Sequence, residues 1–385
     1  MRRNKKTVIT AAAGCMLLAW LSFCLVVPRN AEAAVGSRIK DAKGQGFISL
    51  AQRWNNKINK INNQKYASGK EVVGYYTKDW ETDTQSDNSL KINSDKITGV
   101  ATFSYKVGLS GEITGETPKS ALDTALDTGI ETLALVHNLT SSGFNRQLIH
   151  SILTNPILRT NTVSNIYKVL VKDEFDGVHI DFENIPPGDR QEFNEFIDEL
   201  KAKLEPDGFK VTIALPAKTV DNPSDEWSGA FDYKHISESV DKVMLMTYDE
   251  HYFGGSAGPV ASKPWVEKVV NYSLSVIPKE KILLGIGNYG YDWFVSGGGY
   301  KSVPSKNAVA IARNYGAEIK WDDSNQTPYF YYWQNYQNHV VWFESKESAA
   351  FKLDLVNKYG LQGIALWKLG FEAPGFWQMV AGKLN

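Results

Sequence analysis

Short runs of apolar residues alternate along this chain with longer segments in which apolar residues recur every three or four positions. The runs are rich in β-branched and aromatic residues, and many follow a Gly, Asp or Lys. Continuous apolar runs of this length are typical of strands buried on both faces, as in parallel sheets. The pattern predicts eight such strands, at residues 71–77, 97–104, 131–137, 177–183, 210–216, 242–249, 281–287 and 362–367.

Segments with helical periodicity separate the predicted strands. Residues 189–204 show it clearly, because Phe193, Phe196 and Leu200 recur on one face. The same character is found in residues 118–126, 263–276 and 346–359. Eight strand–helix units predict an α/β protein with the fold of a (β/α)8 TIM barrel. A doubly wound open sheet is the alternative. The count of eight, and the lack of a Gly-rich phosphate loop after the first strand, favour the barrel.

Two segments do not fit a plain barrel. Residues 105–116 contain three glycines and predict a hairpin after the second strand. Residues 288–344 are too long for an ordinary βα loop, and they contain two aromatic strands, 329–333 and 340–343, around a turn at 334–339. We therefore expect a small α+β insertion between strands seven and eight. Both segments follow the carboxyl ends of strands, where the active sites of barrels are built.

The first 33 residues have the layout of a secretory signal peptide. Four positive charges precede an uncharged, mostly apolar stretch at 7–27, and an A-x-A cleavage site follows at 31–33. Cleavage would release a secreted protein to the extracellular space or cell wall. The alternative is an uncleaved anchor that keeps the protein at the membrane, since about 20 apolar residues can span a bilayer. Residues 34–70 form a polar, Asn-rich lead-in, and residues 71–385 form the barrel.

Composition and charge exclude several classes of protein. The chain has 42 basic and 43 acidic residues, and residues 1–33 hold five of the basic and one of the acidic ones, so the remainder carries a net charge of −5. Such a chain lacks the cationic surface that nucleic acids need. Both cysteines, Cys15 and Cys24, fall in the predicted signal peptide, and no spacing of metal ligands is found. We expect no metal and no cofactor. The 11 Trp and 18 Tyr suit sugar rings as well as a large core.

The fourth predicted strand carries the most informative polar residues. Because strand side chains alternate between faces, His179, Asp181 and Glu183 all face the barrel interior. Ionisable groups there are unfavourable unless they have partners or a catalytic purpose. Glu183 comes last, where a substrate can reach it. A neighbouring carboxylate can keep a carboxyl protonated, as acid–base catalysis requires. The alternative is a buried polar network that only fixes the strand.

The same segment resembles the signature of glycoside hydrolase family 18, the chitinase-type barrel. The family motif DxxDxDxE on strand four reads here Asp176-Gly-Val-His179-Ile-Asp181-Phe-Glu183, so three of its four acidic positions match. His179 is the departure, since many members carry Asp there.

Further segments resemble the family in order and location. Met246-Thr-Tyr248-Asp249 is similar to the MxYD motif of strand six, and Trp367 ends strand eight, where the family places a Trp beneath the −1 sugar. Other family positions are matched by Tyr75 and Tyr76 on strand one and by Tyr289 after strand seven. The similarity covers essentially all of the chain after the lead-in. Within the family, the chain looks most like bacterial cell-wall and spore-cortex N-acetylglucosaminidases.

The resemblance implies a retaining, substrate-assisted mechanism. Glu183 would be the general acid, while Asp181 would orient the substrate's 2-acetamido group, whose oxygen attacks C1. Tyr248 would donate a hydrogen bond to that oxygen. The residues implied in substrate binding are Trp367, Asp249, Met246, Tyr75, Tyr76, Tyr289, His179 and Asp176.

His179 raises a question about pH. An ordinary histidine changes charge between about pH 5 and 8, so we expect coupling to Asp181 to shape the pH profile. The alternative is that His179, in place of the Asp of other members, abolishes activity. Two other histidines, His137 and His251, stand alone in the sequence and are expected to be hydrogen-bonded structural groups.

These features predict an exported, monomeric hydrolase of β-1,4-linked N-acetylglucosamine glycans. Its expected partner is its polysaccharide substrate, and the N-terminal segment would allow a transient association with the membrane. Peptidoglycan and spore cortex are favoured over chitin. The alternatives are a non-hydrolytic, chitinase-like glycan-binding protein and an endo-N-acetylglucosaminidase that acts on N-glycans. The intact acid at Glu183 favours a hydrolase.

Overall fold

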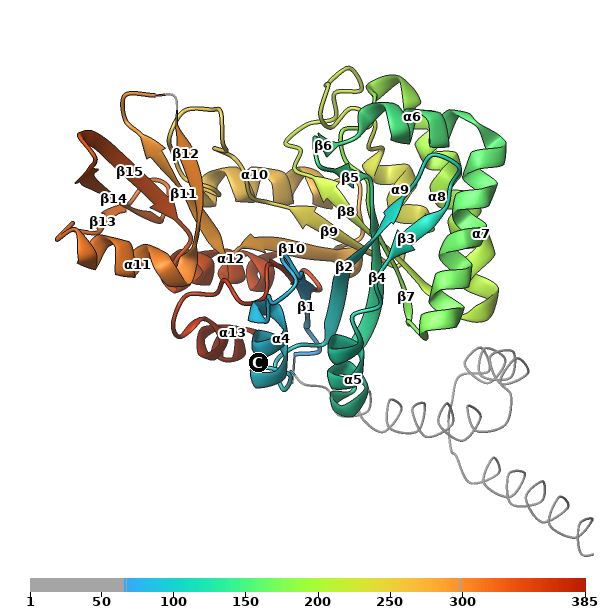
Figure 1. The fold of residues 1–385 in the computed structure, drawn as a ribbon, viewed down its shortest axis with the longest axis horizontal. Helices are drawn as coiled ribbons and strands as arrows, with labels where there is room; N and C mark the ends of the chain where they lie inside the picture. The colour runs from blue at the N-terminus through green and yellow to red at the C-terminus, as the bar shows by residue number, and fades with distance from the viewer. Residues whose placement is uncertain (1–65, 67, 298) are drawn as a thin grey trace, which may run out of the picture. The chain divides into compact units, whose positions relative to one another are not determined.

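The computed structural model describes residues 66, 68–297 and 299–385. The predicted signal peptide and most of the predicted lead-in lie outside these residues. Eight parallel strands are present: β1 (Glu71–Tyr76), β2 (Gly99–Val107), β4 (Glu131–His137), β7 (Gly177–Asp181), β8 (Lys210–Pro216), β9 (Lys242–Met246), β10 (Ile282–Gly287) and β16 (Gly363–Trp367). Each pairs with the next, and β16 pairs back to β1, so the sheet closes into a barrel (Figure 1). The predicted TIM barrel is confirmed.

Ten α-helices lie in the described part of the chain: α4 (Gln85–Ile92), α5 (Lys119–Thr128), α6 (Arg146–Thr154), α7 (Pro156–Asp173), α8 (Arg190–Leu204), α9 (Tyr233–Ser239), α10 (Lys263–Leu274), α11 (Ser305–Asn314), α12 (Lys346–Tyr359) and α13 (Phe376–Leu384). Short 3-10 turns are found at η1 (Pro187–Asp189), η2 (Glu205–Asp207) and η3 (Lys279–Lys281). The four segments predicted as helices are all helical. Local chemistry explains the start of α7, where the Asn155 side chain accepts the N–H groups of Ile157 and Leu158 and Pro156 occupies the first turn.

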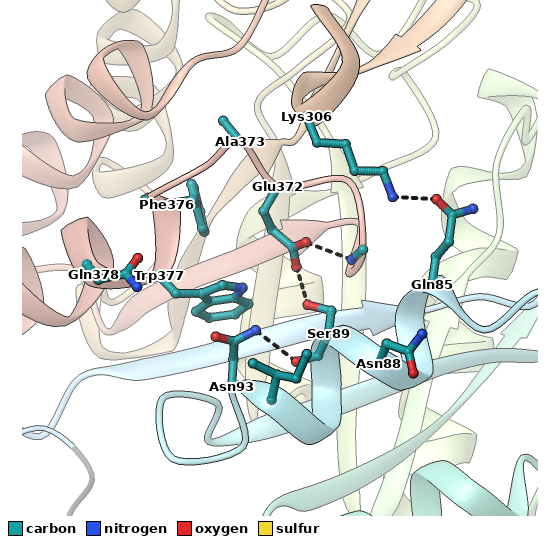
Figure 2. Close-up of a pocket in the computed structure, with 13 residues that line it drawn as sticks. Gln85, Asn88, Ser89, Asn93, Lys306, Glu372, Ala373, Phe376, Trp377 and Gln378 are labelled. Carbon is teal, nitrogen blue, oxygen red and sulfur yellow. Dashed lines mark hydrogen bonds between the residues drawn. The ribbon is translucent and has the colours of Figure 1, made fainter. Parts of the chain in front are cut away.

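A hollow of about 340 Å³ lies between α4 and the chain around the start of α13 (Figure 2). The Glu372 carboxylate accepts the Ser89 hydroxyl at 2.6 Å and the Gly370 N–H at 2.9 Å, and Lys306 donates to Gln85 at 2.6 Å. None of the residues that the sequence singles out for chemistry lines this hollow.

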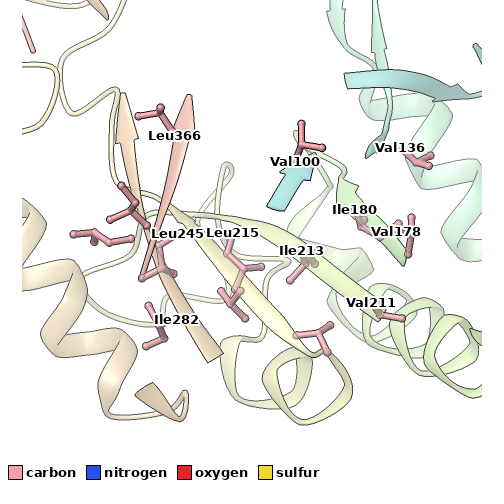
Figure 3. Close-up of a cluster of buried hydrophobic side chains, with 14 of the residues drawn as sticks. Val100, Val136, Val178, Ile180, Val211, Ile213, Leu215, Leu245, Ile282 and Leu366 are labelled. Carbon is pink, nitrogen blue, oxygen red and sulfur yellow. The ribbon is translucent and has the colours of Figure 1, made fainter. Parts of the chain in front are cut away.

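The main core lies between the barrel strands and the surrounding helices (Figure 3). Val178 and Ile180 of β7 belong to it and are fully buried, as the alternation of strand side chains requires. A smaller apolar cluster fills the barrel interior and includes Val73, Leu133 and Met244. The polar residues of β7 therefore sit above a packed floor of apolar side chains.

The hairpin predicted after the second strand is present. The end of β2 pairs in antiparallel fashion with β3 (Ile113–Gly115), from Tyr105 opposite Gly115 to Val107 opposite Ile113. A second, two-residue hairpin, formed by β5 (Leu139–Thr140) and β6 (Gly143–Phe144), follows β4.

The predicted insertion is confirmed, and it is larger in strand content than the sequence suggested. Its antiparallel sheet has the order β12-β11-β15-β14-β13. The strands are β11 (Tyr289–Phe294), β12 (Tyr300–Pro304), β13 (Lys320–Asp322), β14 (Thr327–Gln334) and β15 (Gln337–Phe343). The expected turn falls at Asn335 and Tyr336, both with positive φ, which is typical of a tight two-residue hairpin.

The two faces of the insertion sheet have different neighbours. One face packs against α11, through Phe330, Val341 and Ala308. The other face carries Tyr289, Tyr291 and Trp293, and it packs against side chains at the barrel mouth, including Tyr248 and Trp367. The insertion therefore forms one wall of the mouth.

Candidate active site

β7, the strand that carries the acidic residues, ends at Asp181, two residues earlier than predicted. Glu183 leaves the strand ladder because the side chain of Asn138, which directly follows β4, holds its backbone. Asn138 donates from Nδ2 to the Glu183 carbonyl at 2.9 Å and accepts the Glu183 N–H on Oδ1 at 3.0 Å. This fully buried amide thus fixes the position of Glu183 at the barrel mouth. Sequence reasoning missed Asn138, although a polar residue at the carboxyl end of a barrel strand is a usable signal.

Three carboxyl groups at the mouth have raised pKa values. Burial raises the pKa of Asp181 to about 7. The pKa of Glu183 lies well above its usual range because of burial and the nearby charges of Asp181 and Asp249. Burial also raises the pKa of Asp249, against the opposing effect of two tyrosine hydrogen bonds. Glu183 is therefore held in the protonated form that a general acid needs.

Tyr248 and Asp249 lie just beyond β9, after Thr247. Asp249 adopts a positive φ of 60° and accepts the hydroxyls of Tyr289 at 2.5 Å and Tyr291 at 2.9 Å, both from the insertion. Burial and the neighbouring carboxylates hold the pKa of Tyr248 well above 10, so its phenol keeps its proton. Tyr291 was not predicted, although it shares a strand face with the predicted Tyr289.

Two glycines of β10 make room for these side chains. A Cβ on Gly285 would lie 2.1 Å from the Leu245 carbonyl and 3.1 Å from the Tyr248 ring. One on Gly287 would lie 2.8 Å from the Tyr289 ring. Because the clash at Gly285 is with backbone, a larger residue there would displace the strand that carries the site.

Aromatic rings surround the end of β16. Trp367 contacts Tyr75 and Phe103 edge to face, with ring centroids 5.2 and 5.7 Å apart, and remains partly exposed. The Trp367–Lys368 peptide bond is cis. The Lys368 ammonium is buried and donates to the Thr77 hydroxyl at 2.8 Å. Trp367 thus presents an aromatic surface within the mouth.

His179 lies inside the barrel in a chain of hydrogen bonds. Its Nδ1 is 2.9 Å from the Thr212 hydroxyl, which donates to the Val178 carbonyl at 3.0 Å, so Nδ1 carries the proton. Its Nε2 is 2.9 Å from the Tyr75 hydroxyl, which completes the network. Burial lowers the pKa of His179 to about 3. The expectation that His179 changes charge between pH 5 and 8 is therefore wrong, because desolvation keeps the ring neutral.

The structure does not bring every candidate residue to the mouth. Asp176 precedes β7, at the opposite end from Glu183, and accepts the Thr132 N–H at 2.7 Å and the Thr132 hydroxyl at 2.9 Å. Tyr76 is buried in the core outside the strands. Met246, the last residue of β9, is partly buried and shares the inward face with Met244. Met246 therefore lies at the mouth, where the remaining candidates also converge: Tyr75, His179, Asp181, Glu183, Tyr248, Asp249, Tyr289 and Trp367.

The two isolated histidines are hydrogen-bonded, as expected. His137 accepts the Leu139 N–H on Nδ1 at 3.0 Å and stacks on Phe103 with centroids 4.2 Å apart. Burial, with a smaller effect from nearby Lys106, lowers the pKa of His137 to about 4. His251 donates from Nδ1 to the Pro259 carbonyl at 3.0 Å.

The fourth strand of this barrel, β7, carries acidic residues and leads to a protonated carboxyl, and aromatic rings line the mouth. Together these features are typical of one class of glycosidase. The chain belongs to the glycosyl hydrolases family 18, whose model matches residues 71–372. Membership makes the protein a glycosidase and implies a glycan substrate that contains N-acetylglucosamine.

Several relatives are similar over most of this chain. A cortical fragment-lytic enzyme of Bacillus anthracis is 31% identical over 304 residues, which cover 76% of this chain and 69% of that protein. The crystal structure of the Bacillus cereus spore cortex-lytic enzyme SleL has a TM-score of 0.78 at 28% identity, covering 82% of this chain and 74% of that one. A chitinase from Chromobacterium violaceum ATCC 12472 has a TM-score of 0.77 at 29% identity, covering 82% and 99%.

We expect His179→Asn to leave the pH dependence of kcat/KM unchanged, because the histidine it replaces is already neutral across the working range. The variant should be less stable by about 1–3 kcal/mol, since a buried hydrogen bond is lost. Thr212→Val, which removes the same bond from the other side, is the matched control. A shift of either limb of the profile by more than about half a pH unit would show that His179 carries charge.

Proposed function

We propose that the protein is an exported hydrolase that cleaves β-1,4-linked N-acetylglucosamine glycans. Peptidoglycan, and spore cortex in particular, is favoured over chitin. The observation that carries the proposal is Glu183: a carboxyl with a strongly raised pKa, fixed by Asn138 at the end of β7. A protein that only binds glycans has no use for a protonated acid held in this way.

The proposed reaction uses the substrate's own acetamido group as nucleophile. Its carbonyl oxygen attacks C1 while Glu183 transfers its proton to the departing glycosidic oxygen, so the C1–O bond breaks and an oxazolinium ion forms. Asp181 accepts the acetamido N–H and balances the positive charge, and the Tyr248 hydroxyl donates to the acetamido oxygen to orient it. The Glu183 carboxylate then removes a proton from the water that opens the oxazolinium ring. The configuration at C1 is retained.

The neighbouring groups fit these roles. Tyr248 keeps its proton, because burial and the nearby carboxylates raise its pKa, so it can act as a donor. Asp249 accepts hydrogen bonds from Tyr289 and Tyr291. We propose that it holds the Tyr248 side chain and the sugar in the correct position relative to each other. Trp367 would lie under the ring of the sugar that reacts.

The preference for peptidoglycan and the export of the protein rest on other observations. Relatives named as cortex-lytic enzymes, from two Bacillus species, support a cell-wall substrate. The charge and hydropathy pattern of residues 1–33 supports export with cleavage, and an uncleaved anchor is the alternative. Within residues 66, 68–297 and 299–385, no helix has the length and apolar character that crossing a membrane requires.

Digestion of purified spore cortex, vegetative peptidoglycan, chitin and an N-glycosylated glycoprotein tests the proposal. Mass spectrometry should detect new reducing-end N-acetylglucosamine, fastest from the two peptidoglycans. Each glycan after chemical de-N-acetylation is the matched control and should resist cleavage, because the internal nucleophile is gone.

Three outcomes would contradict parts of this proposal. Cleavage of the de-N-acetylated glycans at a similar rate would require another nucleophile. Binding of the glycans without any cleavage would make the protein a glycan-binding protein. Cleavage of N-glycans alone would move the substrate to glycoproteins.

A further inference from the structure

An arginine lies beside the proposed general acid and has no part in the proposed reaction. Arg146 begins α6, and its Nη1 donates to the side-chain oxygen of Asn184 at 3.3 Å. Asn184 directly follows Glu183, and its amide donates to the Phe144 carbonyl at 3.1 Å. The Arg146 side chain is 37% exposed, so its guanidinium is open to a ligand that arrives from solvent.

The buried amide that fixes the acid also fixes the start of α6. The Asn138 carbonyl accepts the Asn145 N–H at 3.0 Å, and its side chain donates to the Asn145 carbonyl at 3.3 Å. Asn145 caps the helix by accepting the Leu148 N–H at 2.9 Å, and Arg146 is the next residue. Because Asn138 holds the Glu183 backbone as well, Arg146 keeps a fixed place relative to the acid.

The acidic partner of Arg146 is easily displaced. Nη2 lies 2.7 Å from the carboxylate of Glu226, in the loop between β8 and α9, and the Glu226 side chain is 80% exposed. Exposed ion pairs of this kind contribute little to stability. A guanidinium presents a planar fork of N–H groups that matches a carboxylate with two hydrogen bonds. A carboxylate on a ligand can therefore take the place of Glu226.

Peptidoglycan and chitin differ in charge at the sugar next to the cut. Every second sugar of peptidoglycan carries a 3-O-lactyl group that ends in a carboxyl group, free or joined to a peptide, whereas chitin is neutral. Cleavage that leaves N-acetylglucosamine at the new reducing end makes the lactyl-bearing sugar the leaving one. Asp181, which serves the reacting sugar, precedes Glu183, whereas Asn184 and Arg146 lie beyond it. The leaving sugar is therefore the one that faces Arg146.

We propose that Arg146 binds a carboxylate on the leaving sugar and so makes the site prefer peptidoglycan to chitin. This rests on the proposed function, because it assigns Arg146 to recognition of that substrate. The carboxylate belongs to the lactyl group where the peptide has been removed and to the peptide where it remains. Glu226 occupies the guanidinium in the free protein and leaves it when the glycan binds. Arg146 determines which glycan is cleaved and takes no part in proton transfer.

The test compares glycans that differ in charge. Peptide-free peptidoglycan strands are used as the free acid and after conversion of the lactyl carboxyl to a neutral methylamide, beside strands that keep their peptides and N-acetylglucosamine oligomers. Arg146→Gln should lower kcat/KM on the free-acid strands roughly 10-fold, the lower end for a hydrogen bond to a charged group, because the site is partly exposed. The methylamide strands and the neutral oligomers should change by less than about twofold. Arg313→Gln, at an exposed position of α11, is the matched control.

Glu226→Gln tests the same contact from the other side and leaves the start of α6 unchanged. Loss of the competing carboxylate should raise kcat/KM on the free-acid strands about 2–4-fold and leave the neutral oligomers unchanged. If Arg146→Gln and Glu226→Gln both lowered activity on every glycan, the pair would only brace the two loops, and the inference would be wrong.

A binding measurement separates this inference from the proposed function. In the Glu183→Gln background, affinity for the free-acid strands should fall about 10-fold with Arg146→Gln and stay unchanged with Arg313→Gln, and the difference should shrink as the salt concentration rises. If the wild-type protein binds glycans but cleaves nothing, the proposed reaction fails, and this comparison still decides the role of Arg146. A loss confined to strands that keep their peptides would assign the bound carboxylate to the peptide. Equal losses on charged and neutral glycans, no loss on any carboxylate-bearing glycan, or no binding of any glycan by the wild-type protein would each overturn the inference.

Discussion

Glu183→Gln is expected to abolish hydrolysis while folding and glycan binding remain nearly intact. The amide keeps the shape of the side chain but has no proton to transfer to the leaving oxygen. A general acid contributes about 10²–10⁴-fold, and here the same group also acts as the base in the second step. The rate is measured on peptidoglycan fragments, and binding is measured with insoluble cortex.

Glu347→Gln is the matched control for this change. Glu347 lies in the first turn of α12, and its side chain is 58% exposed. The control should retain full activity. If Glu183→Gln kept more than half of the wild-type rate, Glu183 would have no part in the mechanism.

Asp181→Asn is expected to lower kcat by about 10²–10³-fold, the usual effect of removing one group that stabilises transition-state charge. It should also stabilise the fold at alkaline pH. Burial raises the pKa of Asp181 from 3.8 to about 7, so between these values the folded protein keeps a proton that the unfolded chain has lost. Ionisation therefore destabilises the fold progressively as the pH rises through this window, with the full penalty present above about pH 7.

Replacing this carboxyl by an amide removes that penalty. The gain in the free energy of unfolding should be roughly 1–4 kcal/mol at pH 8, given that one pKa unit corresponds to about 1.4 kcal/mol. It should disappear near pH 4, where Asp181 is protonated in the folded protein. Melting temperatures of wild type and variant at the two pH values decide the matter. An equal change at both would show that the effect comes from packing and not from charge.

The barrel could be predicted because its strands are buried on both faces and therefore appear as uninterrupted apolar runs. The inward direction of His179 and Asp181 followed from alternation alone, whereas Glu183 lies beyond the end of β7 and is held by Asn138. The same rule places Tyr76 on the face opposite Tyr75, and the structure puts it there, in the core outside the strands. The match to the family motif made both tyrosines candidates, but strand geometry places only Tyr75 inside the barrel.

The contacts that position the site could not be predicted. Asn138 and Glu183 are 45 residues apart, and Asp249 and Tyr291 are 42 apart, so no local pattern connects them. The neutral state of His179 also could not be predicted. It follows from the complete burial of the ring, and the Thr212 hydroxyl that accepts the Nδ1–H hydrogen bond is distant in the sequence. Three strands of the insertion were missed. β12 and β13 are short and largely polar, so they carry little pattern. β11 was missed although Tyr289, Tyr291 and Trp293 alternate with a period of two.

The contact between Asp249 and the two tyrosines of β11 has a consequence for how this protein can diverge. An insertion that only decorated the barrel could be shortened, exchanged or lost during evolution. Here such a deletion would leave a buried carboxylate without its two donors, so an insertion-free barrel would be destabilised at the site itself. Selection on the amino-acid sequence should therefore be stronger at some positions of the insertion than at others. Positions 289 and 291 are tied to the barrel, whereas the outward side of α11 is free to drift. Chimaeras between relatives should exchange barrel and insertion as one unit.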